Sequence, residues 1–222
     1  MDDYIPAIKM PVFIKPSDIQ LREVKPFDAF PLGFSEGSLS ALLFGDELSK
    51  ALFMRGIISS VPSETGIYNI GPAGLIPPKG PLGGTENLYL GRVYSLDELV
   101  SALGLVEEAS IVVVSGFSAL LNRNVEGLVE TRRIADERGL TLILTHETME
   151  MNELNLPAEF TEHFLLPGLF DSLIVLRTNS YRGHYRLNIT ILKAPLDAVS
   201  ALGDHSIPAD SLVKPLLKLI RE

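Results

Sequence analysis

The sequence predicts an α/β fold, with a mostly parallel sheet flanked by helices and an antiparallel hairpin at one edge. Residues 111–114 are a continuous β-branched run and residues 140–145 are predicted to be another uninterrupted buried strand, as expected for parallel strands that are covered on both faces. Two later strands, at residues 173–177 and 185–192, are separated only by a polar turn at residues 178–184. These strands must be antiparallel, because a parallel return needs a crossover of about a dozen residues.

Length, composition and charge limit the classes of protein that the chain can belong to. Its 222 residues, with 46% hydrophobic side chains, suffice for one large domain with a buried core. No apolar run approaches the roughly 18 residues that cross a bilayer, and the start shows no signal-peptide pattern. We therefore expect a cytoplasmic protein that does not bind membranes. The absence of cysteine excludes disulfides and zinc–thiolate sites.

Three regions are predicted along the chain. Residues 1–26 contain four prolines, a density that suits an extended N-terminal arm. Residues 27–195 hold the periodic strands and helices of the core domain. Residues 196–222 form a C-terminal tail with a short helix, which is expected to begin at Pro208 and to be strained or shifted by Pro215.

The remaining elements follow from apolar periodicity and helix caps. Ser95 and Glu98 form a capping box, S-x-x-E, that begins one helix. Another helix is predicted at about residues 46–58. A third helix ends at Gly139 and is expected to bury one face, which carries Val125, Leu128, Val129 and Ala135. Further strands are predicted at residues 38–44, 66–70 and 87–90.

The stretch at residues 37–52, GSLSALLFGDELSKAL, is similar to a phosphate-binding loop that joins a strand to a helix. A working loop reads G-x-x-x-x-G-K-[ST], because glycines let backbone amides approach the phosphates, the lysine neutralises them and the hydroxyl holds Mg²⁺. Here the loop is one residue short, and its metal-binding hydroxyl is missing. We therefore predict a vestigial loop that binds no cofactor and consists of Gly45, Asp46, Ser49 and Lys50.

Six stretches between residues 27 and 194 follow the order of a known family. They are FDAFPLGFSEGS at 27–38, NLYLGRVYSLD at 87–97, TLILTH at 141–146, and the segments 66–79, 110–121 and 171–193. In this order they resemble the core of the RecA-fold recombinases, in particular archaeal RadA and RadB and their paralogues. The resemblance implies a RecA-like sheet in which the strand before the phosphate loop is central.

The positions that match the family's catalytic groups carry other residues. Ser115 stands where the family has the aspartate that organises Mg²⁺, and Pro72 where it has the glutamate that activates water. His146 or Glu147 stands at the nucleotide-sensing glutamine. Hydrolysis needs a polarised phosphate, an organised metal and an oriented water. The resemblance therefore implies a protein with no ATPase activity, no catalytic residue and no metal site.

Other catalytic patterns are incomplete. The four histidines are scattered, and the HETME sequence at residues 146–150 lacks the second histidine of a zinc-binding helix. Ser118 lies in the sequence GFSAL, which lacks the second glycine of a nucleophile elbow. Neither pattern predicts a site.

The segments that match the family's DNA-binding loops offer few positive charges. Residues 147–169 carry five glutamates and no lysine or arginine, and residues 121–126 offer only Arg123. We interpret three further arginines as the solvated face of a helix: Arg132, Arg133 and Arg138. Because nucleic-acid affinity comes mainly from positive side chains, and the net charge is −9, we expect no strong direct binding to nucleic acid.

These features favour a non-catalytic RecA-fold paralogue that acts as a protein-binding or scaffolding subunit in recombination or DNA repair. The expected partner is a RecA-family recombinase or a second copy of the chain in a homo-oligomer. Residues 1–26 and the C-terminal tail are the expected contact surfaces. The alternative is a divergent nucleotide-dependent ATPase of the RecA/RadB/KaiC-like group, which would use Lys50 and the glycines of residues 71–84.

Overall fold

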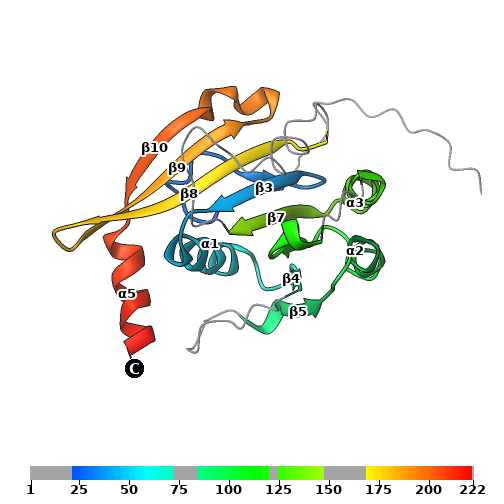
Figure 1. The fold of residues 1–222 in the computed structure, drawn as a ribbon, viewed down its shortest axis with the longest axis horizontal. Helices are drawn as coiled ribbons and strands as arrows, with labels where there is room; N and C mark the ends of the chain where they lie inside the picture. Colours follow the sequence, from blue (N-terminus) through cyan, green and yellow to red (C-terminus); the bar gives the residue numbers. More distant parts are fainter. Residues whose placement is uncertain (1–21, 73–84, 121–124, 148–168, 222) are drawn as a thin grey trace, which may run out of the picture.

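An eight-stranded sheet organises the chain, in the strand order β10-β9-β8-β3-β7-β6-β4-β5 (Figure 1). The computed structural model describes residues 22–72, 85–120, 125–147 and 169–221. The strands are β3 (Leu39–Phe44), β4 (Ile67–Gly71), β5 (Leu88–Arg92), β6 (Ile111–Val114), β7 (Thr141–Glu147), β8 (Ser172–Tyr181), β9 (His184–Lys193) and β10 (Gly203–Pro208).

The sheet is mostly parallel, as predicted. β3 pairs in parallel with β7 on one side and with β8 on the other, and β4, β5 and β6 continue the parallel part. β9 pairs antiparallel with β8 and with β10. The strand that precedes the vestigial phosphate loop is therefore central, with all six of its residues buried.

Helices cover both faces of the sheet, and the side chains of β3 alternate between the two cores. Leu39, Ala41 and Leu43 face the core that includes residues of α2 (Leu96–Leu103) and α3 (Val125–Arg138). Leu42 and Phe44 face the core that includes residues of α1 (Glu47–Ser60) and α5 (Asp210–Arg221). No helix of the described residues is long and apolar enough to cross a membrane.

Smaller elements complete the described chain. A separate antiparallel pair joins β1 (Glu23–Val24) to β2 (Phe34–Ser35). Of the predicted arm only residues 22–26 are described, and there Val24 is buried in the core. The described residues also form three 3-10 helices: η2 (Thr85–Asn87), η3 (Phe117–Ala119) and η4 (Leu196–Ala201).

Helix α2 confirms the capping box, whereas α3 shows that the predicted apolar face was partly wrong. Ser95 accepts a hydrogen bond from the Glu98 backbone at 3.2 Å. Val129 is 55% exposed, although Leu128 and Ala135 are buried. Thr131 occupies the buried position instead, because its hydroxyl donates to the Gly127 carbonyl at 2.7 Å and so needs no solvent.

The antiparallel hairpin is longer than the sequence predicted. β8 and β9 run through the segment predicted as a polar turn and leave only Arg182 and Gly183 at the tip, with φ angles of 50° and 77°. Two positive φ angles are typical of the tight hairpin turn whose twist matches that of the strands. The polar residues at 178–184 indicated a turn, but most of them belong to the ends of two strands, which are polar because this end of the hairpin projects beyond the core into solvent (Figure 1).

The C-terminal region also differs in detail. Pro208 ends β10 and does not begin the helix, which starts at Asp210. α5 continues through Pro215 without a break. β10 itself was not predicted, since its exposed, polar sequence reads as a loop and only its pairing with β9 makes it a strand.

Candidate functional site

The residues singled out by the sequence gather at the carboxyl ends of the parallel strands. β3, β7, β6 and β4 are parallel neighbours, so their carboxyl ends meet there. Gly45 follows β3, Glu147 ends β7, and Ser115 and Pro72 follow β6 and β4. Ligands of open α/β sheets bind at this edge.

Asp46 caps α1 and also ties the helix to β8. Its Oδ1 accepts from the Ser49 backbone N–H at 2.8 Å. The same carboxylate accepts from the Thr178 backbone N–H at 2.7 Å and from the Thr178 hydroxyl at 2.6 Å. In a nucleotide-binding protein the amides at such a helix start face a phosphate. Here a side chain of the same polypeptide supplies the negative charge.

The rest of the turn is fastened to β8 in the same way. The buried Ser49 hydroxyl donates to the Asp46 carbonyl at 2.7 Å and lies 3.3 Å from the Leu176 carbonyl. The Gly45 N–H donates to the Leu176 carbonyl at 2.8 Å. A Cβ at Gly45 would lie 3.3 Å from the Arg177 side chain, a tight contact. The loop is thus a structural joint between β3, α1 and β8.

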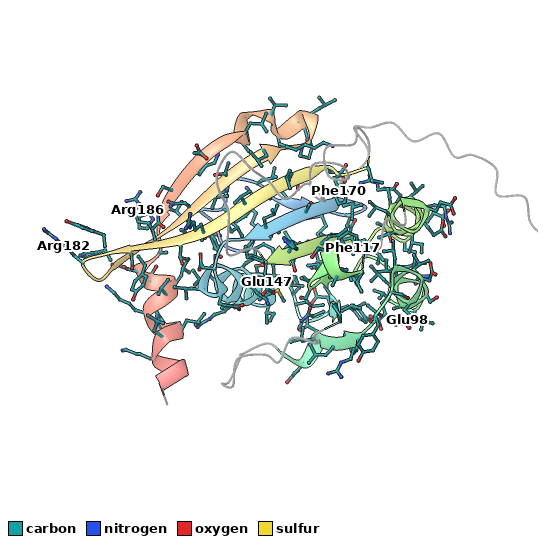
Figure 2. All side chains as sticks on the ribbon, viewed as in Figure 1. Glu98, Phe117, Glu147, Phe170, Arg182 and Arg186 are labelled. Carbon is teal, nitrogen blue, oxygen red and sulfur yellow. The ribbon has the colours of Figure 1, made fainter. Side chains whose placement is uncertain are left out.

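Lys50 forms an ion pair with Glu147, which lies at the end of β7 beside α1 (Figure 2). The lysine side chain is only 12% exposed, whereas that of Glu147 is 41% exposed. The ammonium that would neutralise a phosphate therefore already has an anionic partner on the neighbouring strand. The fold thus brings the lysine of the vestigial loop next to a residue at the predicted nucleotide-sensing position.

Ser115, directly after β6, and Asn69 on β4 form a neutral, buried pair. The Ser115 hydroxyl donates to the Asn69 side-chain oxygen at 2.9 Å. The backbones approach closely here: a Cβ added at Gly71 would lie 2.3 Å from the Ser115 carbonyl oxygen. A neutral pair lacks the carboxylate that Mg²⁺ prefers. Within the described parts of the chain, no three His, Asp or Glu side chains are grouped to hold a metal.

His146 contacts Ser118, although neither residue lies in a sequence pattern that predicts a site. Its Nδ1 lies 2.5 Å from the Ser118 hydroxyl, which η3 positions after β6. The sequence could not reveal this pair or the Asp46–Thr178 contact, because each joins distant segments; Asp46 and Thr178 are 132 positions apart.

Two of the expected surfaces lie largely outside the described residues. Only Glu147 and Leu169 of the acidic segment 147–169 are described, and only residues 125 and 126 of the segment 121–126. The arginines of α3 are described: Arg133 is exposed, as predicted, whereas Arg132 and Arg138 are partly buried. Arg132 pairs with Asp171, and Arg138 donates to the Val106 carbonyl at 2.6 Å.

Comparison with solved structures identifies the architecture. The chain is similar to a KaiC-like protein from the hyperthermophilic archaeon Pyrococcus horikoshii, with a TM-score of 0.57 and 18% identity, over 85% of this chain and 100% of that one. The chain has a RecA-like fold. No protein-family model and no curated protein matches the sequence. At 18% identity the likeness establishes the fold alone, so the function must be argued from the residues.

Proposed function

We propose that this chain is a RecA-fold paralogue, related to RadA and RadB, that has lost nucleotide hydrolysis. It acts as a protein-binding or scaffolding subunit in recombination or DNA repair. The observation that carries the proposal is the Asp46 carboxylate, which occupies the start of α1 with three hydrogen bonds.

The cap opposes phosphate binding both by occupancy and by charge. A phosphate at the α1 N-terminus would have to displace the Asp46 carboxylate or lie beside it. Hydrogen bonds to a charged group contribute about 1.5–3 kcal/mol each, so loss of three would cost several kcal/mol before any nucleotide contact formed. The exposed Glu47 in the first turn adds a second carboxylate that repels a triphosphate.

The other requirements of hydrolysis are weakened at the same edge. Lys50 is paired with Glu147, and Ser115 is bonded to the neutral Asn69. Pro72 has no group that could orient a water molecule. These three observations support the proposal independently of the Asp46 cap.

A protein partner fits the charges better than a nucleic acid does. The chain has a net charge of −9, and two arginines of α3 are bound to carboxylates: Arg132 to Asp136 and Asp171, Arg133 to Glu130 and Glu137. Phosphate binding would have to break these pairs. We propose a recombinase of the RecA family or a second copy as the partner, with residues 1–26 and 196–222 as contact surfaces.

Two experiments test the proposal. Titration calorimetry with Mg-ATP should show no binding, and micromolar affinity would contradict the loss of the nucleotide site. Affinity purification from the native organism should recover recombinase or repair proteins. If sedimentation shows a monomer, and truncation of both ends leaves partner recovery unchanged, the assigned contact surfaces are wrong.

The second candidate is a divergent nucleotide-dependent ATPase, which the retained Lys50 at the carboxyl edge favours. In that case the Lys50–Glu147 pair would open when nucleotide binds. Phosphate release that is present in the wild type and abolished by Lys50→Ala would support the ATPase. No release from either protein would support the first proposal.

A further inference from the structure

Strand β5 is an edge strand of the sheet as far as the described residues show. Among the described residues β5 pairs only with β4. The Val93 N–H donates to the Gly71 carbonyl on the β4 side. Backbone groups alternate in direction along a strand, so the N–H and C=O groups of Leu88, Leu90 and Arg92 point away from β4. Such an edge can pair with another strand.

The side chains of β5 do not protect this edge. Tyr89 is 47% exposed and Leu90 is 54% exposed; the strand contains no proline, and its one charged residue, Arg92, is its last. The opposite edge of the sheet differs, because β10 carries Asp204 near its start and also ends in Pro208. Charge and proline are the usual devices that prevent pairing between edges. The contrast marks β5 as the edge suited to a partner strand.

We propose that two copies of this chain associate through their β5 strands, antiparallel about a two-fold axis at Tyr89, and so join their sheets into one. In this register Leu88 lies opposite the partner's Leu90, and Glu86 lies near the partner's Arg92. Each contact occurs twice, because the interface is isologous.

Hydrogen bonding, charge and aromatic packing select this register. In an antiparallel pair, residues whose backbone N–H and C=O groups point toward the partner strand must lie opposite one another. Leu88 and the partner's Leu90 meet this requirement. The symmetry gives two such pairs, which together exchange four hydrogen bonds. Glu86 and Arg92 are both exposed and carry opposite charges at the two ends of the edge. The antiparallel arrangement brings each charge near its opposite, whereas a parallel one would place like charges together.

Tyr89 supplies the centre of the interface. Its ring already stacks on that of Tyr68, with centroids 4.7 Å apart and planes inclined by 17°. At the two-fold axis Tyr89 lies opposite the partner's Tyr89, so the two stacked pairs form one row of four rings. Aromatic cross-strand pairs are among those that stabilise sheets. This association does not depend on whether the chain binds nucleotide.

Cysteine crosslinking tests the axis, since the chain contains no cysteine. Directly opposed Cβ atoms lie about 4.5–5.5 Å apart, close to the separation of about 3.5–4.5 Å in a disulfide. Under mild oxidation Tyr89→Cys should form a covalent dimer at least tenfold faster than the control Leu105→Cys, whose side chain is 87% exposed. Equal rates for the two variants would overturn the proposal.

Charge exchange tests the register by sedimentation. Glu86→Arg or Arg92→Glu alone should weaken the dimer by about tenfold, since two exposed ion pairs are lost and like charges replace them. The double variant restores both pairs and should return the dissociation constant to near the wild-type value. A double variant as weak as the single ones, or a wild-type protein that stays monomeric at its highest soluble concentration, would overturn the proposal.

Discussion

Replacement of Asp46 by alanine removes three hydrogen bonds at one residue. The Ser49 N–H loses its cap, and the Thr178 N–H and hydroxyl lose a charged acceptor. Loss of an N-cap costs about 0.5–2 kcal/mol, and a donor left without a partner about 1–3 kcal/mol. Asp46 is half-buried, so water replaces part of what is lost. We expect Asp46→Ala to lower the free energy of unfolding by about 2–4 kcal/mol.

Urea unfolding measures this loss. With an m value of about 3 kcal/mol per molar, the midpoint should fall by about 1 M without a change in m. The matched control is Asp97→Ala, which removes an exposed carboxylate from the first turn of α2. That control should cost only about 0.3–1 kcal/mol, because it loses the interaction with the helix dipole and no cap. If the two variants are equally stable, Asp46 does not join α1 to β8 as described.

Three further predictions concern the site and the pH dependence of stability. Ser115→Ala leaves the buried Asn69 oxygen without its donor and should cost about 1–3 kcal/mol in urea unfolding, and a neutral effect would contradict the pairing. Gly71→Ala places a Cβ 2.3 Å from the Ser115 carbonyl oxygen, so the backbone must shift. A loss of about 1–3 kcal/mol is expected, and an unchanged melting temperature would show that β4 yields freely. The pKa of Asp210 is lowered well below its usual range by the hydrogen bonds of its carboxylate, which come from Tyr185, His184 and Lys214. This carboxylate therefore stabilises the fold above the unfolded pKa of about 4, and the contribution is lost as the pH falls toward the lower folded value. Thermal unfolding of Asp210→Asn at a series of pH values should show a shallower acid loss than the wild type, and parallel curves would refute the assignment.

The parallel core could be predicted because burial on both faces dictates composition. β6 is apolar throughout, and β7 has the apolar run Leu142–Leu144 at its centre; that pattern does not depend on the rest of the chain. β10 escaped prediction for the opposite reason. Its residues are mostly exposed, and it is a strand only because β9 offers hydrogen bonds to it. An edge strand is specified by its neighbour more than by its own sequence.

The site could be predicted only as far as its contacts are local. Aspartate is a preferred N-cap residue, and at the start of α1 Asp46 forms that cap. The second partner, Thr178, belongs to a strand end that was predicted as part of a turn, so its bonds to Asp46 were missed. The Lys50–Glu147 pair was missed likewise, because it depends on the register of β3 with β7.

The double attachment of Asp46 has an evolutionary consequence under the proposed function. In a phosphate loop this position serves a ligand, whereas here it holds α1 against β8. A mutation that removes the Asp46 carboxylate would weaken the fold at once, and it would restore no nucleotide affinity while Lys50 stays paired with Glu147 and the metal positions are unchanged. The loss of the Asp46 carboxylate would therefore be disadvantageous as a first step towards a restored nucleotide site. The cap thus makes loss of the nucleotide site easier than its recovery.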